Sequence, residues 1–182
     1  MCRSAISANG RFVAFTSSAS NIVSLSAPAS SALYVYDVLA GTNQLASIGT
    51  NGDVLIKASK AMLSADGTRI AIFGTLSNST GVKNEIYLRD LTQETTLWST
   101  NALNIRDLII SPNGQFVAFG NSLSGLTVYD SGNGTQTRVA AGTGRTPIAF
   151  SGDGSILLGT TTGTGSITPL ALLRVQARIS RL

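Results

Sequence analysis

The amino-acid sequence predicts an all-β protein built from about four tandem copies of one antiparallel unit. A tight-turn signal recurs four times along the 182 residues, and short apolar runs follow each copy. The chain is also rich in glycine, with 19, and only 12% of its residues are charged, about half of the ~25% typical of soluble domains. Such a composition suits strands and turns, and an apolar content of 43% excludes a disordered chain.

The turn signal places Asn or Asp directly before Gly, two residues after a Ser. Asn-Gly and Asp-Gly favour a type I′ hairpin, because both central residues of that turn need a positive φ. Successive turn glycines are 57, 47 and 40 residues apart, which is the spacing of repeats that each form a whole sheet. The predicted turn residues are Asn9, Gly10, Asp66, Gly67, Asn113, Gly114, Asp153 and Gly154.

Each turn signal is followed by a short apolar run that predicts a buried strand. Continuous apolar runs are typical of strands buried on both faces. Three of the runs have a small residue at their centre, where neighbouring sheets would approach closely: Ala14, Ala71 and Ala118. The runs cover residues 12–15, 70–73, 116–119 and 156–158.

A third strand ends in an aspartate in three of the repeats, at Asp37, Asp90 and Asp130. A short turn segment and a more polar fourth strand follow each of them. We interpret these aspartates as turn-forming residues whose carboxylates accept hydrogen bonds from nearby backbone N–H groups, rather than as metal ligands. A four-stranded antiparallel meander repeated in tandem is typical of a β-propeller, so we expect a propeller or partial propeller of about four four-stranded blades.

The repeat resembles a known family. The segments "SPNGQFVAF" and "SADGTRIAIF", with "YVYD" or "IYLRD" at the third strand, resemble the TolB-type, WD-like propeller repeat of bacterial envelope and secreted proteins. The resemblance extends from about Ser4 to about Gly159 and implies a fold rather than an activity. Many relatives carry Asp and Asn before the third strand. The segment "SNIVSLSAPASSA" of this chain has no carboxylate there, so no calcium site is expected.

We expect one repeat domain over residues 1–182, with blades at about 4–50, 61–100, 106–141 and 147–182. The last blade is degenerate. Apolar residues alternate with polar ones in its final segment, "LALLRVQARISRL", which favours a closing strand. An amphipathic helix is the alternative, because Arg174, Arg178 and Arg181 would then share one face. These arginines are the candidate contact residues for a partner or a negatively charged surface.

Four blades are few for a propeller, which has ~4–8. The chain is therefore a fragment of a longer protein, a closed four-bladed ring, or a subunit that buries its end blades against another chain. The chain starts almost directly in its first predicted strand, without a capping segment, which favours the fragment or the assembly. Unpaired apolar end blades would otherwise associate with other chains.

Composition argues against several classes of function. The chain has no histidine, which excludes a Ser-His-Asp or Cys-His arrangement and a His-ligated metal site. The glycine-rich segments lack the Gly-Lys-Ser/Thr ending of a phosphate-binding loop. We therefore predict no catalytic residue, no cofactor and no metal. The net charge is +4, but the basic residues form no run, so nucleic-acid binding is not expected. No run of 18 apolar residues predicts a membrane span.

The sequence thus predicts a non-enzymatic protein-binding or scaffold module of an extracytoplasmic bacterial assembly, periplasmic or at the cell surface. Its partner would be another protein, or a second copy reached through the end blades. The alternative is a propeller segment that docks or gates substrate for a catalytic domain elsewhere in a longer polypeptide. A third interpretation is a sugar-binding, lectin-like module. Rigid loops on a propeller lower the ordering cost of binding, so the function is expected in loops and end blades.

Overall fold

The structure is a computed structural model that describes residues 4–24, 31–78, 81–123, 125–140, 145–163 and 166–174. Within these residues the regular elements are fifteen β-strands, and every paired strand runs antiparallel to its neighbour. The predicted all-β class is confirmed.

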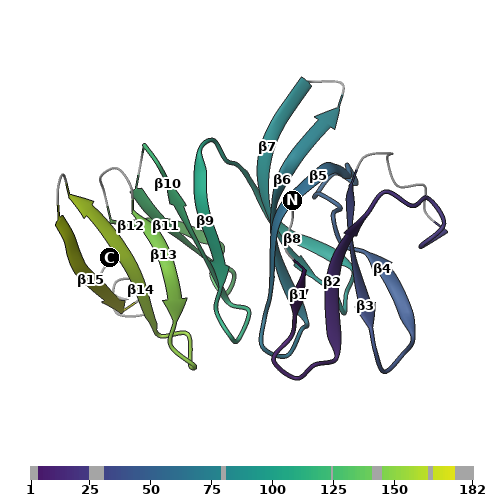
Figure 1. Cartoon of the computed structure of the whole chain (residues 1–182), viewed down its shortest axis with the longest axis horizontal. Helices are drawn as coiled ribbons and strands as arrows, with labels where there is room; N and C mark the ends of the chain where they lie inside the picture. The colour runs from purple at the N-terminus through teal and green to yellow at the C-terminus, as the bar shows by residue number, and fades with distance from the viewer. Residues whose placement is uncertain are drawn as a thin grey trace. The chain divides into compact units, whose positions relative to one another are not determined.

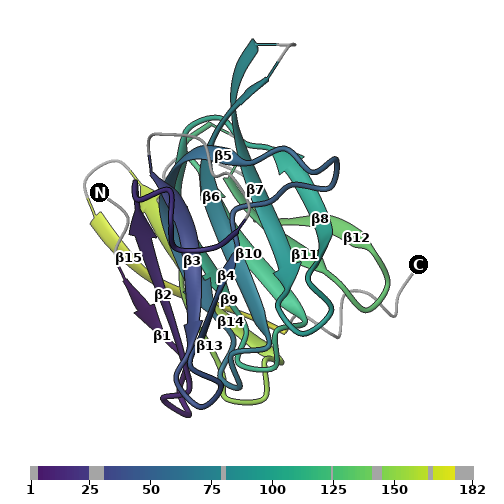
Figure 2. The same ribbon diagram turned by 90° about the vertical axis from the view of Figure 1, so that its right-hand side faces the viewer.

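The strands form four sheets in chain order, and within each sheet consecutive strands are neighbours (Figure 1; turned by 90° in Figure 2). The first sheet comprises β1 (Ala5–Ile6), β2 (Phe12–Ser17), β3 (Ala32–Asp37) and β4 (Thr42–Leu45). The second comprises β5 (Leu55–Leu63), β6 (Arg69–Asn78), β7 (Gly81–Asp90) and β8 (Thr95–Asn101). The third comprises β9 (Ile105–Ile110), β10 (Phe116–Asn121), β11 (Gly125–Asp130) and β12 (Thr135–Ala140).

The fourth sheet has three strands in the described part of the chain: β13 (Thr146–Phe150), β14 (Ile156–Gly163) and β15 (Ser166–Arg174). The strand predicted for the final segment, residues 170–182, is therefore present as far as Arg174, and the helical alternative is wrong for residues 170–174. The remainder of that segment, 175–182, lies outside the described residues.

The chain divides into two compact units, residues 1–102 and 103–182, which we call the first and the second unit. The first unit contains the first two sheets. Its core joins Phe12, Ala14 and Leu33 of one sheet to Ile70 and Tyr87 of the other. The small Ala14, fully buried, lets the two sheets approach, as its place in the sequence predicts.

The second unit contains the third and fourth sheets, packed in the same manner. Phe116, Ala118 and Leu126 of the third sheet meet Leu157 of the fourth, with Phe150 against this cluster. The rings of Phe116 and Phe150 are stacked, with centroids 6.3 Å apart. Each unit is thus two antiparallel sheets that bury one apolar layer between them.

In each sheet the first two strands are joined by the predicted Ser-X-Asn/Asp-Gly turn. The glycine N–H donates to the serine carbonyl, at 2.9 Å for Gly10, Gly114 and Gly154 and 3.0 Å for Gly67. Only the glycines of these turns have positive φ, from 70° to 75°. The type I′ prediction is therefore wrong: the central residues have the negative φ of a type I turn, and the glycine that follows takes the left-handed conformation.

The side chains of the turn explain why the Asn or Asp keeps a negative φ. Ser111 Oγ donates to Asn113 Oδ1 at 2.6 Å and accepts the N–H of Phe116 at 2.9 Å. Asn113 Oδ1 also accepts the N–H of Gln115 at 3.1 Å. The other three turns repeat this serine–Asn/Asp pair, at Ser7 and Asn9, Ser64 and Asp66, and Ser151 and Asp153. These bonds hold the four-residue loop without a second positive φ.

Neighbouring turns within a unit are also bonded to each other. Asn9 Nδ2 donates to the Asp66 carbonyl at 3.0 Å in the first unit, and Asn113 Nδ2 donates to the Asp153 carbonyl at 3.5 Å in the second. A Cβ built on Gly67 would lie 2.2 Å from Phe12 Cδ2, so only glycine fits between these turns. We call this end of each sheet the turn end, and the opposite end the loop end.

Candidate functional site

The aspartates predicted at the ends of the third strands lie at the turn ends and accept backbone hydrogen bonds. Asp37 Oδ1 accepts the N–H groups of Leu39 at 3.0 Å and Ala40 at 3.2 Å. Asp90 Oδ1 accepts those of Thr92 and Gln93, both at 2.9 Å, and Asp130 Oδ1 that of Gly132 at 2.8 Å. Among the described residues no group of three or more His, Cys, Asp or Glu could hold a metal ion.

One of these aspartates forms an ion pair. Arg11 Nη2 lies 2.7 Å from Asp37 Oδ2, and Arg11 Nε donates to the same carboxylate at 3.0 Å. The guanidinium hydrogen bond, helped by the backbone N–H of Ala40 and of Leu39, lowers the pKa of Asp37 to about 2. The eight predicted turn residues and the three aspartates thus lie within turns, and none of these contacts gathers them into a common site.

Of the three arginines predicted to contact a partner, Arg174 is the last residue of β15, while Arg178 and Arg181 lie outside the described residues. The described part of the chain contains no helix long and apolar enough to cross a membrane. The two candidate sites within the described residues are formed by residues that the sequence did not single out.

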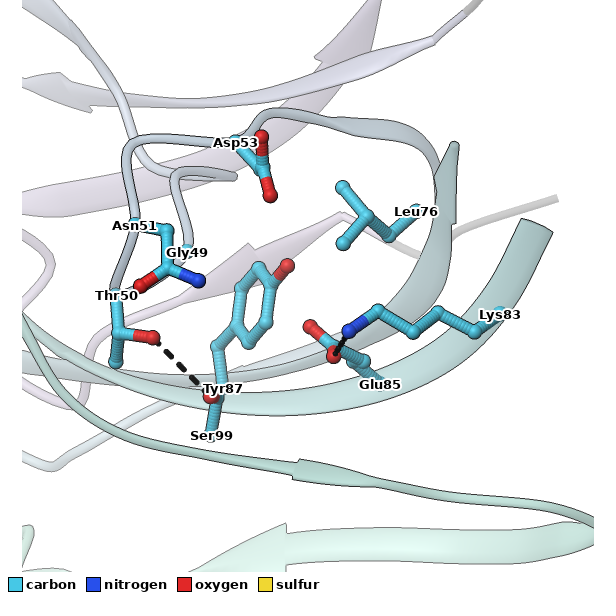
Figure 3. Close-up of a pocket in the computed structure, with 9 residues that line it drawn as sticks. All are labelled: Gly49, Thr50, Asn51, Asp53, Leu76, Lys83, Glu85, Tyr87 and Ser99. Carbon is cyan, nitrogen blue, oxygen red and sulfur yellow. Dashed lines mark hydrogen bonds and ion pairs between the residues drawn. The ribbon is translucent and has the colours of Figure 1, made fainter. Parts of the chain in front are cut away.

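A polar pocket lies at the loop end of the second sheet, within the first unit (Figure 3). Its volume is about 100 Å³. One wall is the loop between β4 and β5, and the other is formed by side chains of β6, β7 and β8. The lining residues are Gly49, Thr50, Asn51, Asp53, Leu76, Lys83, Glu85, Tyr87 and Ser99.

The loop is folded tightly over the sheet because of two glycines. Gly49 N–H donates to the Asp53 carbonyl at 2.7 Å, and Gly52 N–H donates to the Gly49 carbonyl at 3.1 Å. Gly52 has a φ of 81°, which glycine adopts without strain. A Cβ on Gly49 would lie 2.8 Å from Tyr87 Oη. Glycine at this position therefore lets the loop backbone lie against the phenol.

Three residues of β7 line the pocket because alternate residues of a strand face the same side. Lys83 Nζ lies 2.6 Å from Glu85 Oε1, and the side chain of Glu85 is only 9% exposed. Lys83 is 39% exposed, so its end of the ion pair is in contact with solvent. With Asp53 on the loop, the pocket holds two carboxylates and one ammonium.

Tyr87 is the most buried polar group of the pocket. Its side chain is 1% exposed, and its hydroxyl has no hydrogen bond. Figure 3 shows this hydroxyl pointing between Asp53, Leu76 and Glu85. Burial, together with the nearby Glu85 and Asp53 carboxylates, raises the pKa of Tyr87, although Glu85 accepts no hydrogen bond of ordinary geometry from it. The hydroxyl is therefore protonated at neutral pH and is left without a partner.

A second feature lies at the loop end of the third sheet, in the second unit. Leu103 is 67% exposed and Leu123 is 71% exposed. The Asn121 side chain connects them: its Nδ2 donates to the Leu103 carbonyl at 2.6 Å, and its Oδ1 accepts the N–H of Leu123 at 2.7 Å. Ser122 N–H also donates to the Asn104 carbonyl at 3.1 Å. Leu103 and Leu123, the leucine pair, are thus held close together on two ordered loops.

Sequence reasoning missed both features. The spacing of Lys83, Glu85 and Tyr87 was a usable signal, because polar residues at alternate positions of a strand share one face and need partners on it. Nothing in the sequence tied these residues to Gly49 or Asp53, which lie on a loop that precedes them by more than a strand.

No protein-family model and no curated protein matches the sequence. Solved structures do. TolB from Acinetobacter baumannii matches with a TM-score of 0.57 and 20% identity, over 95% of this chain and 40% of that protein. The chain has a TolB-like β-propeller fold. Each sheet is therefore a blade, and the predicted relationship to this type of propeller is confirmed at the level of the fold.

Propellers of proteases match equally well. The β-propeller domain of the Trilobed protease from Pyrococcus furiosus, described as an open velcro topology, has a TM-score of 0.59 and 14% identity over 93% of this chain and 51% of that one. Acylaminoacyl peptidase from Pyrococcus horikoshii has a TM-score of 0.59 and 14% identity over 92% of this chain and 29% of that one. The chain thus spans about half or less of these structures and corresponds to part of a propeller.

Proposed function

We propose that the chain is a non-enzymatic protein-binding module of an extracytoplasmic bacterial assembly, and that it contacts its partner through loop-end surfaces. The observation that carries this proposal is the leucine pair. Two leucines that are each about two-thirds exposed lie on loops fixed by one asparagine. Removing both side chains from water would stabilise a complex by about 2–4 kcal/mol, and the loops need little further ordering.

Two further observations support binding rather than catalysis. Two of the three charged groups of the pocket, Lys83 and Glu85, already form an ion pair at 2.6 Å. The described aspartates at the ends of the third strands accept hydrogen bonds from their own turns. The extracytoplasmic location rests on the resemblance of the repeats to propellers of bacterial envelope and secreted proteins.

The proposal is tested by placing a photo-crosslinking amino acid, p-benzoylphenylalanine, at Leu123 in the source bacterium. Leu39 is the matched control, because it is 78% exposed but lies in a turn-end loop. We expect a discrete protein adduct from position 123, identified by mass spectrometry, and none from position 39. Leu103→Lys should abolish the adduct. Equal adducts at both positions, or no adduct at either, would overturn the proposal.

Self-association is one form of the same proposal. If the adduct contains a second copy of this chain, light scattering of the purified chain should show a dimer that Leu103→Lys returns to monomer. If the adduct contains another protein, Leu103→Lys should not change the oligomeric state of the purified chain. The crosslink thus identifies which of the two partners is used.

The second candidate function is a propeller segment that docks or gates substrate for a catalytic domain in a longer polypeptide. The similarity to propellers of the Trilobed protease and of acylaminoacyl peptidase favours it. A reading frame that continues from Leu182 into a catalytic domain would support this candidate, and the crosslink from Leu123 would then join the two domains of one polypeptide. A frame without a catalytic domain would exclude it.

A further inference from the structure

We propose that the loop-end pocket of the first unit binds a primary ammonium group, such as that of a lysine side chain. The proposal extends the proposed protein-binding function. It rests on that function in one respect only, because the lysine is taken to belong to the partner protein. It is carried by Tyr87, whose buried hydroxyl has no hydrogen bond and points into the pocket.

The volume limits the ligand to a head group. A cavity of about 150 Å³ accommodates a benzene molecule, which has six heavy atoms. This pocket, at about 100 Å³, holds fewer, so a monosaccharide or a nucleotide does not fit inside it. An ammonium group with the last methylene groups of its side chain does fit. The polar lining also offers no broad apolar face on which a sugar ring could stack.

The charge of the pocket selects a cation. Asp53 and Glu85 contribute two negative charges, and Lys83 contributes one positive charge. An anion in the pocket would lie beside these two carboxylates. A divalent metal ion would have two carboxylates in the pocket, one of them already beside the Lys83 ammonium, which is fewer charged oxygens than a hard cation prefers.

The acceptors fit the three hydrogens of an ammonium group. Glu85 and Asp53 supply carboxylate oxygens, and the protonated Tyr87 hydroxyl supplies a lone pair from the floor of the pocket. Lys83 shows that this carboxylate accepts an ammonium, because its Nζ lies 2.6 Å from Glu85 Oε1. The incoming group would take the inner position while Lys83, more than a third exposed, moves outward.

The test titrates the full chain with Nα-acetyl-lysine methylamide and follows the backbone amide resonances of Gly49 and Gly52. We expect saturable shifts at these amides. Nα-acetyl-norleucine methylamide, which lacks the ammonium, should cause none. Shifts of the same size with norleucine, or none with lysine, would overturn the proposal and leave the pocket as a hydrated surface feature. Tighter binding of Nα-acetyl-arginine methylamide would overturn the choice of an ammonium.

Variants locate the binding in the pocket. Glu85→Gln should weaken lysine binding about tenfold, since a charge-assisted hydrogen bond contributes that much. Tyr87→Phe should weaken it about threefold to tenfold. Lys83→Met should strengthen it about threefold, because the internal competitor is removed, whereas a merely structural ion pair would predict no gain.

Glu94→Gln and Tyr36→Phe are the matched controls, because neither residue lines the pocket. We expect wild-type binding from both, and a loss as large as that of the pocket variants would contradict the assignment. The crosslink from Leu123 does not depend on this pocket. Loss of lysine binding with an intact crosslink would therefore overturn the pocket alone and leave the proposed protein-binding function in place.

Discussion

The turn ends of the four blades are built alike, whereas their loop ends differ from blade to blade. At the turn end, four blades use the same serine, the same Asn or Asp and the same glycine, with hydrogen bonds that agree within about 0.1 Å for the glycine N–H. At the loop end, one connection closes a polar pocket and two others each expose a leucine. The repeated end supplies the framework, and the variable end carries the features that can distinguish a partner. Substitutions at the two ends should therefore have opposite consequences.

Gly67→Ala should give the largest effect. Gly67 has a φ of 75°, and a Cβ there would lie 2.2 Å from Phe12 Cδ2 in the core. Backbone strain and overpacking together should cost about 3–4 kcal/mol of unfolding free energy, measured by chemical denaturation. Gly10→Ala is the control: its φ is 70°, but nothing lies within 4 Å of its Cβ, so about 1 kcal/mol is expected. Equal losses would show that packing between the turns is unimportant.

Ser111→Ala should give the next largest effect. Ser111 is fully buried, and its Oγ bonds both Asn113 and the N–H of Phe116. Removing it leaves a buried N–H without a partner, which should cost about 2 kcal/mol in thermal or chemical unfolding. The equivalent Ser151→Ala should cost about 1 kcal/mol, because Ser151 is partly exposed and water can replace its hydroxyl. A larger loss at Ser151 would contradict this order.

Asp153 should make the turn end sensitive to acid. Hydrogen bonds from the Ser151 hydroxyl, the Ser155 N–H and the Ser155 hydroxyl lower the pKa of Asp153 from 3.8 to about 2. Because the folded pKa is depressed, this stabilisation is present above about pH 4 and is lost as the pH falls toward 2. Asp153→Asn keeps an acceptor oxygen, as Asn9 and Asn113 do at equivalent positions. The thermal unfolding temperature should therefore fall less between pH 5 and pH 2 in the variant than in the wild type. Equal falls in the two proteins would contradict the lowered pKa of Asp153.

Tyr87→Phe should have the smallest effect on stability. The phenol hydroxyl is buried without a hydrogen bond, so its removal should change the unfolding free energy by less than about 0.5 kcal/mol, or raise it slightly. Chemical denaturation measures this directly. A loss above about 1.5 kcal/mol would mean that the hydroxyl stabilises the fold, and the contrast between a structural turn end and a functional loop end would then fail.

The framework could be predicted because its determinants are local in the sequence. The Ser-X-Asn/Asp-Gly signal and the apolar run after it lie within about ten residues of each other, so each blade could be recognised separately. The turn type was the exception. Propensity favours type I′ for Asn-Gly, but the Ser111 hydroxyl and its equivalents fix the Asn or Asp side chain and change the backbone conformation.

The pocket could not be predicted because its members are distant in the sequence and ordinary in type. Asp53 lies on the connection between the first two blades and Glu85 on a strand of the second, and only the packing of the loop over Tyr87 brings them together. The leucine pair depends on one asparagine side chain that bonds two loops, and no pattern in the sequence marks that bond. Local patterns therefore predicted the repeat, and tertiary contacts determined the candidate sites.

The hydrogen bond between neighbouring turns has a consequence for how such a chain can change in length. Asn9 and Asn113 each donate an amide hydrogen to the next turn in their unit, whereas Asp66 and Asp153 have no amide to donate. Donor and acceptor blades therefore alternate, and the smallest segment with a complete bond is two blades. Duplication or deletion of a two-blade segment preserves every such bond. Loss of a donor blade alone would leave the aspartate turn beside it without this bond, so the two-blade segment is the smallest unit that carries it.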